Sequence, residues 1–586
     1  MADGSERVRG AFRKAEDVAP IESGGAPPSP PEADGEAEQF RKCALFPLND
    51  FGNGQRFSAY YGQDVMFVPR VAWFCWDGKV WGKDDDKLNV RGLAQKVAAR
   101  IIDEAAHVSL EDWEIQKLEE EPRLIDLRDE IHAKGTGKTP DDVQEEIKIK
   151  EKLDWIARIK RRRGALRADH RKHAKASGNS AKITNMILES TVKQSLDLEA
   201  LDADPLVINT QSGVLKFEVD RAMQKGLRED GCSDMDGSVS MELLPHAREM
   251  RLTKIMDVQY DAAATCPKFD AFMAQIHPDP EIRAFLQRWY GLSMTGLTGE
   301  QKLVFQYGDG SNGKSVLADL MANMMADYSA TAAIESLTGT QKRSGGEATP
   351  DLIPLIGARM VRASEPEEGE RLREAEIKKM TGGEPMQMRA NYGDTIEVLP
   401  QFKLTISGNH KPEIRGTDNG IWRRILLVKF GVIIPDDKQD LELPEKLWEE
   451  RSGVLNWLIA GLTQYLESGL QEPQSVLAET RAYREESDPV GAFFGACCEF
   501  AADAPFMKSA ELMKAFKLWQ EIEGQSVWTP GTITKRISSR AEKYRDPRTG
   551  LQFQKHKSSV SGYLGIRLTK EHSQALDEYD AKQGKL

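Results

Sequence analysis

The stretch LVFQYGDGSNGKSVLADLMANMM (303–325) decides the fold, because it places a glycine-rich loop between an apolar strand and a helical pattern. The loop carries the spacing G-x-x-x-x-G-K-S in its required context. Successive backbone N–H groups and a helix N-terminus can surround a phosphate there, and this context disfavours a mere glycine-rich turn. We predict that Lys314 reaches the β and γ phosphates of ATP and that the Ser315 hydroxyl holds Mg²⁺. The predicted nucleotide-binding residues are Gly308, Asp309, Gly310, Ser311, Asn312, Gly313, Lys314 and Ser315.

Two later strands each end in a polar residue suited to phosphate chemistry. ARMVRASEPEEG places Glu365 at the end of an apolar strand, with Glu367 and Glu368 just beyond. FKLTISGN ends in Asn409. We predict that Glu365 orders the metal and activates water, and that Asn409 senses the γ-phosphate. The alternatives are a solvated acidic loop and an Asn that begins a turn.

A pair of arginines precedes the next apolar strand. In GIWRRILLVKF they are Arg423 and Arg424. By composition alone they are equally well explained as a basic edge of the sheet.

Together GDGSNGKS, RMVRASEPEEG, MTGGEPMQMRA, FKLTISGNHKP and GIWRRILLVKF resemble the ordered motifs of superfamily 3 helicases. The nearest relatives by this resemblance are phage and plasmid primase/helicase ATPases, related to the poxvirus replicative NTPase. Weaker similarity runs upstream through WDGKVW, LDADPLVINTQSGVL and CPKFDAF.

The resemblance implies an AAA+ type core in a hexameric ring, with each ATP held between subunits. It also implies that Arg423 or Arg424 is an arginine finger that completes a neighbour's site, without saying which. MTGGEPMQMRA resembles the family's pore-lining hairpin region. Lys378, Lys379 and Arg389 are therefore candidates to touch a threaded strand, with ordinary surface charge as the alternative.

Changes in composition, together with this resemblance, predict an α/β multidomain chain. The expected parts are a disordered tail (1–39), an N-terminal α/β region (40–108), a charged helical insertion (109–180), the remainder of the N-terminal domain (181–265), an AAA+ type P-loop ATPase domain (266–487) and a winged-helix domain (488–586). Hairpins are expected at Asp77-Gly78 and Ser212-Gly213, and an amphipathic helix over 90–107.

The charged insertion changes sign along its length. Acidic blocks give way to nine Lys or Arg between residues 158 and 175, against one acid, Asp169. A solvated helical face and a nucleic-acid-facing arm both explain this run.

The C-terminal part is strongly basic. Residues 529–570 hold ten Lys or Arg and two acids, and the order of short helices and strands suits a winged helix. The candidate DNA contacts are Lys535, Arg536, Arg540, Lys543, Arg545, Lys555 and Lys557. A solvated face is again the alternative.

The 586 residues carry a net charge of −13, so any nucleic-acid surface must be local. The six cysteines form no C-x-x-C pair, and no cysteine spacing suits zinc, which leaves a primase module without support. No apolar run is long enough for a membrane span. We expect a soluble protein of the bacterial cytoplasm, with any primase or polymerase supplied by another polypeptide.

These patterns favour an ATP-dependent DNA helicase that translocates on single-stranded DNA and opens forked DNA during phage, prophage or plasmid replication. The alternative function is that of an ATPase that melts or marks an origin without processive unwinding. A non-catalytic DNA-binding scaffold would leave the ATPase motifs unexplained.

Overall fold

The computed structural model describes residues 33–219, 239–339, 348–366, 369–389, 391, 394–414, 419–524, 527–557 and 559–583. The chain divides into two compact units, residues 1–204 with 243–255, and residues 205–242 with 256–586. Residues 205–219 and 256–265 therefore belong to the second unit, although they were expected in the N-terminal domain. Their apolar side chains explain the difference, because Ile208, Leu215 and Met256 are buried in the large core of the second unit.

The first unit combines helices with a small antiparallel sheet. The sheet contains β1 (Val65–Val68), β2 (Ala72–Trp76) and β3 (Trp81–Asp84). Trp76 pairs with Trp81 across a turn in which Gly78 has φ +107°, so the hairpin predicted at Asp77-Gly78 is confirmed. The helices are α2 (Ala33–Ala44), α3 (Asp50–Tyr61), α4 (Leu88–Glu104) and α8 (Ser180–Gln194).

The helix predicted over 90–107 is α4, and it buries Val97 and Ile101. Helix α2 begins inside the segment predicted to be disordered, so residues 33–39 of that prediction are wrong. The physical reason is contact with α4 and the residues after it, since Phe40 stacks on His107 at 5.4 Å and Glu36 forms an ion pair with Arg100. The rest of the predicted tail lies outside the described residues.

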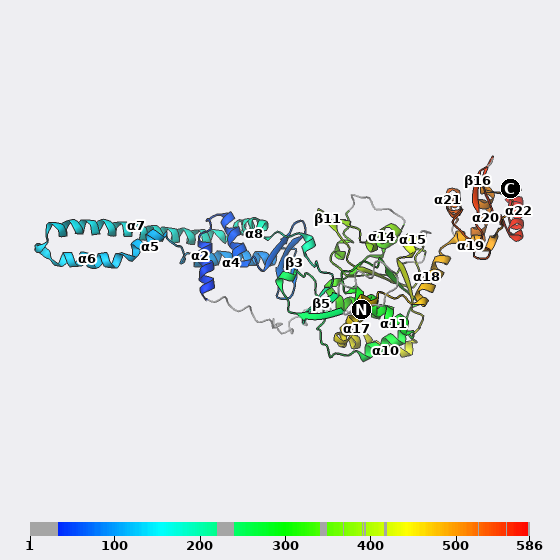
Figure 1. Ribbon diagram of the computed structural model, residues 1–586, viewed down its shortest axis with the longest axis horizontal. Helices are drawn as coiled ribbons and strands as arrows, with labels where there is room; N and C mark the ends of the chain where they lie inside the picture. Colours follow the sequence, from blue (N-terminus) through cyan, green and yellow to red (C-terminus); the bar gives the residue numbers. More distant parts are fainter. Residues whose placement is uncertain are drawn as a thin grey trace, which may run out of the picture. The chain divides into compact units, whose positions relative to one another are not determined.

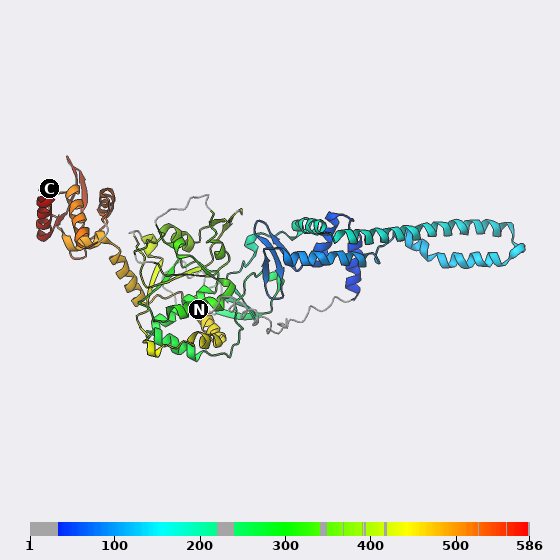
Figure 2. The same cartoon turned by 180° about the vertical axis from the view of Figure 1, so that it is seen from behind.

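The charged insertion is a helical arm in the first unit. Helices α5 (Asp112–Glu119) and α6 (Glu121–Ala133) lead out, and α7 (Pro140–Ser177) returns as a single helix of 38 residues (Figures 1 and 2). Leu124 and Ile131 of α6 form a narrow apolar seam with Ile149 and Ile156 of α7.

The second unit is built around a five-stranded parallel sheet with the order β13-β7-β12-β9-β8. The strands are β7 (Leu303–Tyr307), β8 (Ser329–Thr331), β9 (Met360–Ser364), β12 (Lys403–Gly408) and β13 (Ile425–Lys429). Their near-continuous apolar sequences agree with burial on both faces. The main covering helices are α10 (Pro267–Ile276), α11 (Pro280–Ser293), α12 (Lys314–Met325), α16 (Leu443–Glu449), α17 (Arg451–Ser468) and α18 (Gln474–Glu486).

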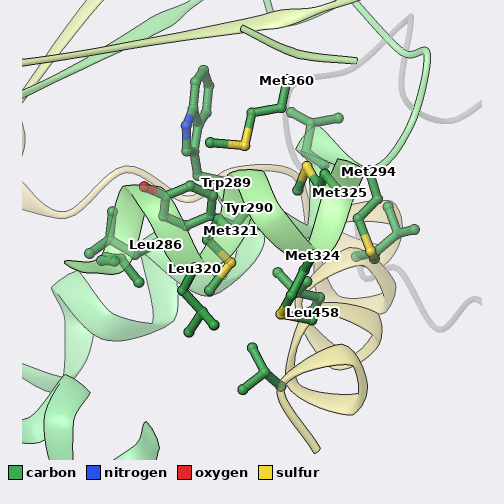
Figure 3. Packing of buried hydrophobic residues seen from close by; sticks show 14 of the residues in the cluster. Leu286, Trp289, Tyr290, Met294, Leu320, Met321, Met324, Met325, Met360 and Leu458 are labelled. Atoms are coloured by element: carbon green, nitrogen blue, oxygen red, sulfur yellow. The ribbon is translucent and has the colours of Figure 1, made fainter. Parts of the chain in front are cut away.

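A methionine-rich core fixes these helices on the sheet. Trp289 and Tyr290 of α11 lie beside Met321 of α12 and Met360 of β9 (Figure 3). Tyr290 accepts a hydrogen bond at 2.9 Å from Gln306, and Trp289 donates one at 2.9 Å to Thr405. The polar edges of both aromatic rings are thereby satisfied by the strands they cover.

Smaller elements flank this sheet. Strands β4 (Val207–Thr210), β5 (Gly213–Val219) and β6 (Val239–Leu244) form a three-stranded sheet in which β4 and β5 are antiparallel, and Thr210 pairs with Gly213. The second predicted hairpin therefore exists, with its turn at residues 211–212. Helix α13 (Ile334–Leu337) follows β8, helix α14 (Glu374–Gly382) leads to a hairpin of β10 (Met386–Arg389) and β11 (Thr395–Val398), and α15 (Asn419–Trp422) precedes β13.

The C-terminal residues form their own apolar cluster around Phe493, Phe516 and Tyr563. Their order is α19 (Pro489–Cys497), β14 (Cys498–Phe500), β15 (Met507–Lys508), α20 (Ser509–Ile522), α21 (Pro530–Arg540), β16 (Gln554–Lys557), β17 (Ser561–Leu564), β18 (Ile566–Leu568) and α22 (Lys570–Gln583). Strand β17 lies between β15 and β16 in a three-stranded sheet. Among the described residues, no helix is both long and apolar enough to cross a bilayer.

Candidate active site

Three sequence-predicted site residues meet at the carboxyl edge of the parallel sheet. Tyr307 pairs with Gly408, and Ser364 pairs with Ser407. The residues that directly follow these strand ends are Gly308, Asn409 and Glu365. The register therefore brings together the loop start, the amide and the carboxylate that the sequence predicted separately.

The loop 308–313 turns sharply between β7 and α12. Gly313 has φ +79°, and a Cβ there would lie 2.6 Å from a methyl group of Ile276, so only glycine fits. The Asn312 amide donates to the Phe430 carbonyl at 3.3 Å, which ties the loop to the end of β13. Within the described part of the chain, the backbone N–H groups of residues 309–313 donate no hydrogen bond. They form a row of free donors at a helix N-terminus, which suits an anion.

Lys314 lies at the centre of this edge. Its side chain is buried, and its ammonium donates to the Gly308 carbonyl at 2.5 Å and to the Asn409 amide oxygen at 3.1 Å. Burial lowers the pKa of Lys314, while the nearby charges of Asp309 and Glu365 act in the opposite direction. The ammonium is thus held between neutral acceptors that a phosphate oxygen can replace.

The backbone is strained at Glu365, whose carboxylate is one of the charges near the Lys314 ammonium. The φ of Glu365 is +58°, an uncommon value for a residue other than glycine, and its N–H donates to the Ser407 carbonyl at 2.7 Å. The strand thereby ends at Glu365, and the carboxylate stays exposed. Glu367 and Glu368 lie outside the described residues.

Ser315 and Glu365 fit a hard divalent cation. The Ser315 side chain is exposed on the first turn of α12, and oxygen ligands of this kind suit Mg²⁺, which keeps several waters and needs few protein ligands. The described residues contain no group of three or more His, Cys, Asp or Glu that could form a metal cage. A magnesium ion bound here would neutralise phosphate charge.

An apolar cleft of about 540 Å³ adjoins the loop at Ser311 and Gly313. Phe272 of α10 and Val316 of α12 line one part, and Ile434 and Leu443 line another. The Ser311 carbonyl accepts a hydrogen bond from the Ile434 N–H at 2.8 Å. This bond joins the glycine-rich loop to the wall of the cleft that contains Ile434. The size and lining suit a planar base. No sequence pattern predicted this cleft, although FDAFMAQI and the segment after β13 supply its walls.

The structure separates the two arginines. Arg424 is buried, and it donates to the Gly420 carbonyl at 2.6 Å and the Thr381 hydroxyl at 3.1 Å. Arg423 is exposed and, among the described residues, its side chain donates to the Gln301 amide oxygen at 2.8 Å, which Arg424 also approaches at 3.4 Å. One arginine is built into the fold, and its neighbour faces outward.

The candidate pore residues lie on or beside the β10–β11 hairpin. Arg389 ends β10, and its N–H donates to the Thr349 hydroxyl at 2.9 Å. Lys378 and Lys379 lie on the preceding helix α14, where Lys379 is exposed and lies 3.9 Å from Glu376. The hairpin tip includes residues outside the described part.

Some predicted DNA-contact cations of the C-terminal domain have partners within the domain, and the others are exposed. Arg540 forms an ion pair with Asp488 at 2.6 Å, and the Arg536 guanidinium lies 4.6 Å from the centre of the Trp528 ring. Lys535 is exposed on α21, as are Lys543 and Arg545 in the following loop. Lys555 and Lys557 lie on β16, where every side chain is exposed.

Two family models match the chain. Residues 54–278 match the family described as "D5 N terminal like", and residues 306–424 match a family of unknown function, DUF5906. The second match covers the loop 308–313, Glu365, Asn409 and both arginines. Each match covers less than half of the chain.

Several viral proteins are similar in sequence. "Putative helicase L207/L206" of Acanthamoeba polyphaga mimivirus is 26% identical over 51% of this chain and 31% of its own length. "Putative helicase 022R" of Frog virus 3 is 22% identical over 75% of this chain and 52% of its own length. The chain therefore spans between about a third and half of these relatives. Among solved structures, "The apo structure of NrS-1 C terminal region (305-718)" aligns with 53% of this chain and 77% of its own, at a TM-score of 0.35 and 11% identity.

Proposed function

We propose that this chain is an ATP-driven DNA helicase of the superfamily 3 type, with a phosphate-loop AAA+ type core that works in a hexameric ring. The observation that carries the proposal is the position of Lys314, between the glycine-rich loop and Asn409, next to Glu365. This arrangement provides donors for the phosphates, a carboxylate for the metal and water, and a neutral amide at the γ-phosphate.

The chain's own residues divide the work as follows. The backbone N–H groups of residues 309–313 and Lys314 bind the phosphates, and the apolar cleft beside Val316 receives the base. Ser315 and Glu365 hold Mg²⁺, and Glu365 also accepts a proton from the attacking water. Asn409 senses the γ-phosphate, and the exposed Arg423 completes the site of a neighbouring subunit.

The DNA surfaces of this proposal lie in two other places. The β10–β11 hairpin, with Lys378, Lys379 and Arg389, contacts the phosphates of a threaded single strand. The element order from α19 to β17 matches a winged helix, in which α21 and the β16–β17 hairpin contact a duplex at a fork. The proposed contacts without an ion pair among the described residues are Lys535, Lys543, Arg545, Lys555 and Lys557, while Arg536 and Arg540 also have partners within the domain.

The biological setting we propose is replication of a phage, prophage or plasmid in the bacterial cytoplasm, with a separate primase or polymerase. The experiment is an assay of DNA-stimulated ATP hydrolysis and fork unwinding by the purified chain, with Lys314→Ala as control. Displacement of a long strand supports a translocating helicase. DNA-stimulated hydrolysis without displacement favours the alternative, an origin-melting ATPase. The absence of both would contradict the proposal.

A further inference from the structure

The helical arm carries a row of cations with no protein partner. Arg158, Arg161, Arg171, Lys172 and Lys175 are exposed on the second half of α7, and none has an ion pair within the described residues. They lie outside the candidate active site and the C-terminal domain.

Most other cations of the same arm are neutralised. Lys160 pairs with Glu121 at 2.5 Å, and Arg162 pairs with Glu114. Lys134 pairs with Asp142 at 2.7 Å, and Lys138 with Glu146 at 2.6 Å. Lys150 and Lys152 in the first half of α7 also have no ion pair within the described residues, but the densest run of unpaired cations lies between residues 158 and 175.

The free cations share a helical face. The spacing of Arg158, Arg161, Lys172 and Lys175 places them within about one third of a turn of each other, opposite the buried Ile156 and Ala174. The face is about 26 Å long, from the rise of 1.5 Å per residue. Ala165 and Ala168 lie between the two cationic pairs, so no large side chain prevents a long polyanion from lying along the helix. Asp169 at its margin is the one acid within this basic stretch.

We infer that this face of α7 binds the phosphodiester backbone of a nucleic acid, as a contact site in the first unit that is separate from the proposed ATPase core. The face lacks the aromatic and aliphatic anchors that a protein interface buries at its centre. A linear array of lysines and arginines instead matches the regular charges of a nucleic acid and contributes affinity without sequence choice.

The test compares two full-length variants that lose the same charge. The face variant carries Arg158→Gln, Arg161→Gln, Lys172→Gln and Lys175→Gln. The control variant carries Lys117→Gln, Arg128→Gln, Lys134→Gln and Lys148→Gln, whose cations are ion-paired in the same arm. Glutamine keeps helix propensity, and basal ATP hydrolysis and the melting temperature serve as folding checks.

Binding of labelled DNA is measured without nucleotide over a range of salt concentrations, once with a duplex and once with a single strand. The face variant should bind DNA at least about tenfold more weakly near 0.1 M salt. The slope of log affinity against log salt concentration should become shallower by about 3, for the duplex or for the single strand, whichever the arm contacts. The control should change much less. Equal losses in both variants would mean that only net charge matters, and an unchanged face variant would overturn the inference. If the face variant loses binding of labelled polyglutamate while its DNA binding stays unchanged, the face would belong to an acidic protein partner instead.

Discussion

At the scale of single residues, Arg423 and Arg424 show what a sequence can and cannot reveal. The pair is visible as a motif, but both residues lie in the turn between α15 and β13, and only tertiary contacts decide which side chain is buried. Arg424 donates to Gly420 and Thr381, whereas Arg423 is exposed. The structure therefore supports Arg423 as the candidate finger.

The two arginines should respond differently to alanine. Arg424→Ala leaves buried acceptors unpaired and should lower the free energy of unfolding by about 2–3 kcal/mol. Arg423→Ala should leave stability unchanged and lower ATP turnover by roughly 10³-fold or more, as is typical of an arginine finger. Thermal unfolding and steady-state hydrolysis measure both effects. Full turnover in Arg423→Ala would return this residue to the role of a basic edge.

Substitutions at Lys314 and Glu365 should distinguish ATP binding from ATP hydrolysis. Lys314→Ala removes the cation that faces the phosphates, so hydrolysis should be lost while the fold is kept. Glu365→Gln keeps the loop and its donors, so it should bind ATP and fail to turn it over. Binding of a fluorescent ATP analogue and phosphate release distinguish the two variants. Loss of nucleotide binding in Glu365→Gln would contradict this division of roles.

At the scale of elements, the sequence predicts strands and their polar ends but not their neighbours. Apolar runs predicted β7, β9, β12 and β13 and placed Gly308, Glu365 and Asn409 at strand ends. The order β13-β7-β12-β9-β8, which makes β12 the neighbour of β7 and β9, depends on packing between distant segments. The apolar cleft was missed for the same reason, because α10 and the segment after β13 are far apart in sequence.

The C-terminal elements should contact DNA through the exposed side of their hairpin. Lys555→Gln with Lys557→Gln should weaken duplex binding and reduce the log–log salt slope by up to about 2, since each phosphate contact contributes about 0.9. Arg540→Gln is the matched comparison. It breaks the ion pair with Asp488 and should mainly change the stability of this domain. Fluorescence anisotropy at several salt concentrations tests the pair, and an unchanged slope in the double variant would make these lysines a solvated face.

At the scale of the whole molecule, the chain has a net charge of −13, yet α7 and β16 each carry exposed cations without an ion pair among the described residues. Composition alone predicted that any DNA surface must be local. Composition could not distinguish the cations of α7 and β16 that lack an ion pair from cations that have one, because ion pairing depends on which acidic side chains the fold brings near. The division into two units also differs from the expected boundary, since β4 and β5 bury their apolar faces with the second unit.

Removal of residues 488–586 should test whether ATP hydrolysis is independent of the C-terminal domain. These residues have their own apolar core, so basal ATP hydrolysis should persist without them. Duplex binding should weaken and its salt dependence should flatten, because a cluster of phosphate contacts is lost. Complete loss of basal hydrolysis in a folded truncated chain would show that the domain contributes to the ATP site.

The most direct measurement of the central claim, an ATP site shared between subunits, mixes Arg423→Ala with Glu365→Gln protein. Each variant alone should be nearly inactive, since each lacks one component at every interface. In a mixed ring, an intact Glu365 from one variant meets an intact Arg423 from the other, and a complete site forms again. We predict that ATP hydrolysis recovers in the mixture. Mixed rings that demonstrably form but stay inactive would contradict the shared site.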